Sequence, residues 1–230
     1  MVLKQIFAAL RKTDALGEMT DQFAEMLQLG QWMFQQARGV LAGQTSADDV
    51  RDELYVRDRK INALERHIRE RIVVHLVTGH EADVGVCLVL MSVVKDAERI
   101  GDYCKNLFQV AEQFTGQYTR AEYTVPLDDL AGQIDELFPV VREAFTEASK
   151  SQSKLAVTDT TMLRKQCDML VKQLLTPGGP AAPEEAAALV MRARFLKRIA
   201  AHLGNIATSV NNPVPMLDYV GKKPLDEPEG

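Results

Sequence analysis

The chain has 230 residues, of which 46% are hydrophobic and 26% are charged, and its formal net charge is -5. This is the composition of a globular protein, long enough for one large domain or two small ones. The acidic balance gives no basic field, which argues against nonspecific binding to nucleic acid. The three cysteines form no C-x-x-C pair, which indicates a reducing compartment, and no stretch reaches the roughly 20 apolar residues that span a bilayer. We expect a cytoplasmic protein.

The first twelve residues, MVLKQIFAALRK, carry an apolar stripe with basic residues beside it. The stripe is too short for a convincing signal peptide and has no cleavage site behind it. We expect residues 1–12 to be an N-terminal amphipathic segment that packs on the protein's own bundle. Docking on a partner protein, a second protomer or a membrane surface is the alternative.

The rest of the first half predicts three long helices. None of the nine prolines precedes Pro126, so this half has no obligatory helix breaker. Apolar residues recur three and four apart, and β-branched residues do not alternate with polar ones, so strands are not expected. Helices are expected from Met19 to a stop at Gly43, over 45–76, and over 81–114. Short loops between them predict an antiparallel three-helix bundle, residues 13–118.

The second half repeats this pattern and predicts a second bundle, residues 119–212. Its helices are expected in 127–152, 159–175 and 183–210, with a turn-rich loop, TPGGPAAP, before the last one. Pro139 lies inside the first of these helices and should kink or split it. Residues 213–230 are expected to be a flexible tail. The sequence thus predicts an all-α fold of two tandem antiparallel three-helix bundles.

An internal comparison supports the duplication. The segment AERIGDYCKNLFQVAEQ, from Ala97, aligns without a gap with LKRIAAHLGNIATSVNN, from Leu196, at an offset of 99 residues. The two segments share an arginine, an isoleucine and an asparagine at matching positions. Each belongs to the third expected helix of its half, so two copies of one three-helix unit are predicted.

The candidate site is a pair of acids in the first of these segments. Glu98 and Asp102 lie one helical turn apart, so they repel each other unless a cation or another helix compensates. Carboxylates at this spacing suit a hard cation, and Asp58, Asn62 and Glu65 on the second expected helix are further candidate ligands. A glycine between the acids, Gly101, would permit close approach of a helix or ligand. The alternative is an ordinary solvated polar face.

The phrase ERIGDYCKN, preceded by HEADVGVCLVLMSVVKDA and echoed by KRIAAHLGN, resembles the PhoU family of phosphate-uptake regulators, as does DRKINALE on the second helix. The resemblance implies two three-helix bundles and a cytoplasmic regulator that restrains phosphate uptake. It implies as partners a phosphate transporter, either ATP-driven or sodium-coupled, and a sensor histidine kinase. It also implies peripheral membrane association through that partner.

The resemblance further implies a site for iron or other metal ions at the family's acid signatures. Carried over residue by residue, these acids are Glu98 and Asp102 in the first repeat. The matching positions of the second repeat hold Lys197 and Ala201, so no metal cluster is expected there. One full site for a divalent or iron cation is expected per chain.

A helical bundle also suits other classes of protein. A di-iron protein of the ferritin-like type requires Glu-x-x-His pairs, and no histidine of this chain follows a glutamate at that spacing. No glycine-rich phosphate loop or activated nucleophile is present either, so we expect a protein that is not an enzyme. A metal-free helical scaffold or oligomerisation protein, such as a homodimer, is the remaining alternative.

Overall fold

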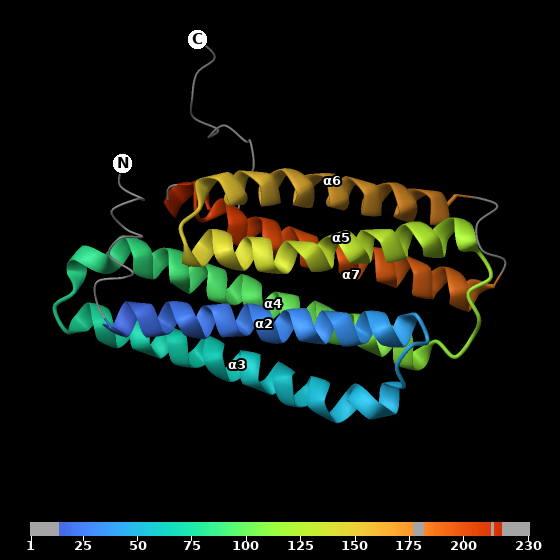
Figure 1. The fold of residues 1–230 in the computed structure, drawn as a ribbon, viewed down its shortest axis with the longest axis horizontal. Helices are drawn as coiled ribbons and strands as arrows, with labels where there is room; N and C mark the ends of the chain where they lie inside the picture. The colour runs from blue at the N-terminus through green and yellow to red at the C-terminus, as the bar shows by residue number, and fades with distance from the viewer. Residues whose placement is uncertain (1–13, 177–181, 213, 218–230) are drawn as a thin grey trace, which may run out of the picture.

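The computed structural model describes residues 14–176, 182–212 and 214–217 (Figure 1). These residues contain no strand, which confirms the all-α prediction. They form six long helices: α2 (Asp14–Leu41), α3 (Ala47–Val77), α4 (Val84–Gln113), α5 (Ala121–Thr146), α6 (Lys150–Leu174) and α7 (Pro183–Thr208). Two short 3-10 helices, η1 (Glu81–Asp83) and η2 (Val214–Met216), precede α4 and follow α7. The predicted segment 1–12 and most of the TPGGPAAP loop lie outside the described residues.

The helices form two groups of three (Figure 1). Helices α2, α3 and α4 contact one another, and so do α5, α6 and α7. The groups meet where α2 packs on α5 and α4 packs on α7, whereas α3 and α6 lie on opposite outer faces. The first helices of the two groups, α2 and α5, therefore pack on each other, and so do the third helices, α4 and α7. This is the arrangement expected of a duplicated unit.

The boundary between α5 and α6 differs from the prediction. Helix α5 runs without a break past Pro139 and ends at Thr146, and α6 begins at Lys150 rather than at residue 159. Ala148 lies in the left-handed region, with φ of 52°, and the Ser149 N–H donates to the Ala144 carbonyl. This is a Schellman-type helix end, usually made by glycine. The sequence pattern missed it because alanine gives no stop signal.

Pro139 does not split α5 because tertiary packing holds the helix on both sides of it. Phe138 and Val141, which flank the proline, are almost fully buried. Their burial, worth about 1.5 to 3 kcal/mol each, compensates for the hydrogen bond that proline cannot donate.

The segment expected to be a flexible tail, residues 213–230, also begins with ordered structure, because η2 contacts α4 and Val214 packs against the core.

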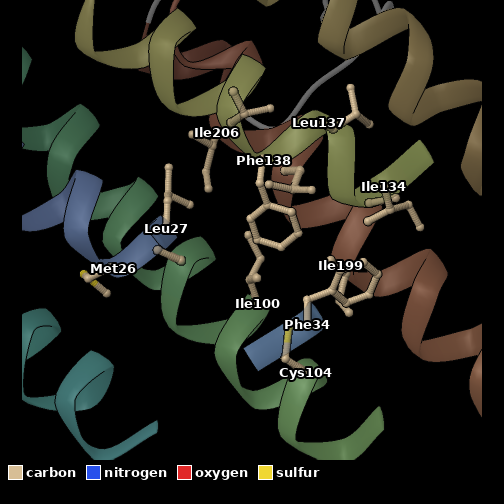
Figure 2. Close-up of a cluster of buried hydrophobic side chains, with 14 of the residues drawn as sticks. Met26, Leu27, Phe34, Ile100, Cys104, Ile134, Leu137, Phe138, Ile199 and Ile206 are labelled. Atoms are coloured by element: carbon tan, nitrogen blue, oxygen red, sulfur yellow. The ribbon is translucent and has the colours of Figure 1, made fainter. Parts of the chain in front are cut away.

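A continuous apolar core joins the two bundles. Figure 2 shows buried side chains from all four interface helices meeting in one cluster, with Phe34, Ile100, Phe138 and Ile199 among them. The rings of Phe34 and Phe138 lie 5.7 Å apart between centroids, and those of Phe23 and Phe145 lie 4.6 Å apart. Aromatic pairs at such distances add to the stabilisation from burial. The bundles are therefore packed as one unit.

Gly101 lets α3 approach α4 inside the first bundle. A Cβ at this position would lie 3.0 Å from Cδ1 of Ile61, closer than side chains ordinarily pack. Ile61 is itself buried, so it has little room to move. The glycine between the two acids thus serves helix packing.

We predict that Gly101→Leu lowers the free energy of unfolding by about 1 to 3 kcal/mol, because the added side chain overpacks the contact with Ile61. Gly132→Ala is the matched control: its Cβ would meet only an arginine nitrogen at 3.7 Å. The control should be stabilised by up to about 1 kcal/mol, since alanine favours the helix. Urea unfolding monitored by circular dichroism measures both. Equal effects would contradict this role of Gly101.

Candidate functional site

The predicted acids of α4 face α3 along the line where the two helices pack. Glu98 is only 8% exposed, so the alternative of a solvated face does not hold for it. Asp58 and Glu65 on α3 are buried to a similar degree and face α4. We refer to Asp58, Glu65, Glu98 and Asp102 as the acidic seam. Asn62 is not part of it, because its side-chain amide donates to the Asp58 carbonyl of its own helix.

One lysine lies between each pair of facing acids in the acidic seam. Lys105 donates to both carboxylate oxygens of Asp58, at 2.9 and 3.0 Å, and to Asp102 at 3.1 Å. Lys95 donates to Glu98 at 2.7 Å, and its Nζ lies 3.7 Å from Glu65. The sequence analysis missed both lysines, although each lies three residues from a signature acid. That spacing places them on the same side of the helix.

Two arginines complete the pairing at the edge of the seam. Arg69 lies 3.0 Å from Glu65 and Arg99 lies 3.0 Å from Asp102, each on the same helix as its acid. Each seam acid thus has a cation within ion-pair distance. Repulsion between Glu98 and Asp102 is thereby compensated by neighbouring side chains.

The lysines of the acidic seam occupy the place predicted for a metal ion. Carboxylate oxygens are donors that hard cations prefer, but the lysine ammonium groups lie where such a cation would bridge α3 and α4. Within the described ranges, no group of three or more His, Cys, Asp or Glu side chains lies close enough to hold a metal ion. As placed, the residues do not fit a metal unless a lysine leaves. A cation at Glu98 and Asp102, assisted by Asp58, Asn62 or Glu65, stays a prediction.

The second bundle has a related ion pair. Lys197 on α7 donates to both carboxylate oxygens of Asp168 on α6, at 2.6 Å each. Its position matches Glu98 in the internal repeat, and the lysine lies on the third helix and its acid on the second, as Lys105 and Asp58 do in the first bundle. The salt bridge between second and third helix is retained.

A separate polar cluster, which was not predicted from the sequence, lies between the bundles. Asp96 on α4 is buried and accepts hydrogen bonds from His202 at 2.7 Å and Asn205 at 2.9 Å, both on α7. The His202 ring also stacks on Tyr103, with centroids 5.6 Å apart. His202 is therefore a packed residue at the bundle interface.

These features define an all-α protein of two three-helix bundles with a shared core and a charge-paired acidic seam. Residues 23–111, which lie within the first bundle, match the family model of the PhoU domain. No curated protein matches the chain in sequence. Within the part of the chain that the structure describes, no helix is long and apolar enough to cross a membrane.

The fold is that of PhoU proteins over both bundles. PhoU from Pseudomonas aeruginosa superposes with a TM-score of 0.76 at 22% identity, covering 85% of this chain and 95% of that one. The phosphate transport system regulatory protein PhoU from Streptococcus pneumoniae superposes with a TM-score of 0.68 at 18% identity, covering 84% and 93%. The predicted resemblance is confirmed.

We predict that Lys105→Met destabilises the protein by about 2 kcal/mol near neutral pH, because it leaves the carboxylates of Asp58 and Asp102 facing each other. Burial opposes the charge on Lys105, but the hydrogen bonds that its ammonium donates to these acids outweigh burial and raise its pKa. A raised lysine pKa stabilises the fold below about pH 10.4, and this stabilisation is lost as pH rises through the folded-state pKa.

Urea unfolding of the wild type and Lys105→Met between pH 7 and 11 checks this prediction. The difference in free energy should stay constant to about pH 10 and then shrink. Lys60→Met is the control, since Lys60 pairs with Glu25 across a more exposed surface and such pairs contribute at most about 1 kcal/mol. A difference that persists at pH 11 would show that the ammonium charge is not responsible.

We further predict that Lys95→Ala creates a dependence on divalent cations. Without the ammonium, Glu65 and Glu98 face each other unbridged, so Mn²⁺ should raise the Tm of the variant by several degrees and leave that of the wild type unchanged. The measurement is a thermal melt in MnCl₂ and in NaCl of equal ionic strength. An equal rise in the wild type would mean that metal displaces the lysine.

Proposed function

We propose that this chain is a cytoplasmic regulatory adaptor of phosphate transport that acts by contact with a phosphate transporter. The observation that carries the proposal is the PhoU domain in residues 23–111, together with the PhoU fold of both bundles. One of the structural neighbours is named as a phosphate transport system regulatory protein. The transporter, ATP-driven or sodium-coupled, would hold the chain at the membrane, and a sensor histidine kinase is a second proposed partner.

The chemistry of the buried cysteines supports a protein that is not an enzyme. Burial raises the pKa of Cys87 to about 11 and that of Cys167 to about 12, and the pKa of Cys104 lies well above its ordinary value for the same reason. These thiols are protonated at neutral pH and cannot act as nucleophiles. The acids of the seam are held in ion pairs, so none is a free general base.

The outer face of α6 is the proposed partner surface. Leu155, Met162 and Met169 are each more than half exposed and lie seven residues apart, so they form one stripe along the helix. Exposed apolar stripes of this kind mark protein contacts, and methionine adapts to varied partners. Because the bundle interface leaves α6 on the outside, the stripe is accessible without any movement of the core. A second copy of the chain is the alternative occupant.

The test is an affinity pull-down of the tagged chain from detergent-solubilised membranes of phosphate-replete cells, with mass spectrometry of the bound proteins. We expect a phosphate transporter or its sensor kinase. Met162→Glu should reduce recovery at least tenfold, because it places a charge in the middle of the stripe. Met191→Glu is the matched control, since Met191 is a comparably exposed methionine on α7.

Recovery of neither partner across several detergents would overturn the adaptor function. Equal recovery with Met162→Glu and Met191→Glu would show that the partner does not bind the stripe on α6, but it would leave the adaptor function standing. Light scattering of both variants tests the alternative occupant: a wild-type dimer that only Met162→Glu makes monomeric would assign the stripe to self-association.

A further inference from the structure

A cavity of about 400 Å³ lies between the two bundles, near the end of α2. Its wall includes Gln35, Arg38 and Gln44 from the first bundle, and Asp128 and Arg192 from the second. The volume is in the range of small-molecule sites. The cavity is separate from the acidic seam, because no seam residue lines it.

Arg192 is the unusual residue of this cavity. It is only 3% exposed, and among the residues that the structure describes it forms one ion pair, with Asp128, whose side chain is 59% exposed. Its guanidinium also lies over the Tyr118 ring, 5.1 Å from the centroid. Its Nε is buried and has no hydrogen-bond partner among the described residues. A buried guanidinium nitrogen without an acceptor is costly, so the described residues do not satisfy the full hydrogen-bonding capacity of Arg192.

Arg38 faces the same cavity from the other bundle. One of its terminal nitrogens donates to Asp135 at 2.9 Å, and this is its only hydrogen bond in the described part of the chain. Asp135 also accepts from Gln31 and Gln35, so its charge is shared among three donors. Most of the N–H groups of Arg38 thus remain available. The cavity lining therefore contains two positively charged guanidinium groups, those of Arg38 and Arg192, and one negatively charged carboxylate, that of Asp128.

We propose that this cavity binds a phosphate-type oxyanion between Arg38 and Arg192. Guanidinium groups match the oxygens of phosphate with paired, charge-assisted hydrogen bonds. The anion would take the place of the Asp128 carboxylate, which is exposed enough to turn into solvent. The side-chain amide of Gln44 is a further donor. Inorganic phosphate and small phosphate monoesters share this chemistry, and the choice of phosphate over other oxyanions rests on the proposed function.

Bound anion would connect the two bundles directly. Arg38 belongs to α2 and Arg192 to α7, and no hydrogen bond or ion pair joins them to each other in the described residues. An oxyanion held by both adds a charge-assisted contact across the bundle interface. As the anion concentration rises, binding therefore makes the interface between the bundles more rigid. The partner of the adaptor would respond to this change in rigidity.

Calorimetric titration of the full chain tests the proposal, with sodium phosphate, AMP and sodium sulfate in separate runs at fixed ionic strength. We expect one site per chain for phosphate or for AMP, and whichever binds more tightly identifies the source of the phosphate group. Arg38→Gln should weaken binding about tenfold or more. Arg194→Gln is the matched control, because Arg194 is an exposed arginine two residues from Arg192 on α7.

A gain-of-binding variant keeps the test independent of folding defects. Asp128→Asn removes the competing carboxylate from an exposed position, so it should tighten binding and increase the rise in Tm that phosphate produces. Absence of heat and of any Tm shift with phosphate and AMP at about 10 mM, a concentration far above ordinary small-ligand Kd values, would overturn the site. So would equal effects of Arg38→Gln and Arg194→Gln, or sulfate binding as tightly as both ligands.

The pull-down described above separates this proposal from the adaptor function. Recovery of a transporter by a wild-type chain that shows no anion binding would refute the cavity alone. Anion binding without any recovered partner would refute the adaptor and leave the cavity.

Discussion

The apolar contact between α2, α4, α5 and α7 is the constraint on which the rest of the structure depends. A three-helix bundle can bury its own apolar stripe, but here each bundle also carries a second apolar face that only the other bundle covers. Phe34, Ile100, Phe138 and Ile199 meet in this shared core. Removing one bundle would expose these residues to water, so neither half is a complete folding unit.

This apolar contact also determines where the charged and polar side chains lie. Because α2, α4, α5 and α7 are occupied with one another, the seam between α3 and α4 lies at the outer side of the first bundle and carries charged residues along its margin. Paired acids there are tolerated because a lysine bridges each pair, and because buried ions require compensation. The Asp96–His202 contact is a polar pair within the apolar interface, and Asp96 is satisfied by hydrogen bonds from α7. The contact between Arg38 and Asp135 likewise crosses the interface, from α2 to α5.

Sequence reasoning succeeded where a feature repeats and failed where it depends on tertiary contact. The spacing of apolar residues predicted the number and order of the helices, and the repeat around Ala97 and Leu196 predicted two copies of one three-helix unit. The end of α5 was missed because Ala148 adopts a conformation usually reserved for glycine. The lysines of the seam were missed because a lysine on a helix is ordinarily solvated, and only the fold shows that Lys105 reaches across to Asp58. Arg192 gave no sequence signal, since its burial is a property of the assembled bundles.

The first helices of the two halves pack on each other, and so do the third helices, so the second helix of each half faces outward. Helix α3 packs on α4 along the ion-paired acidic seam, whereas α6 presents an apolar stripe of Leu155, Met162 and Met169. The two outer faces of this duplicated frame therefore differ in chemistry, because one is lined by ion pairs and the other by apolar side chains.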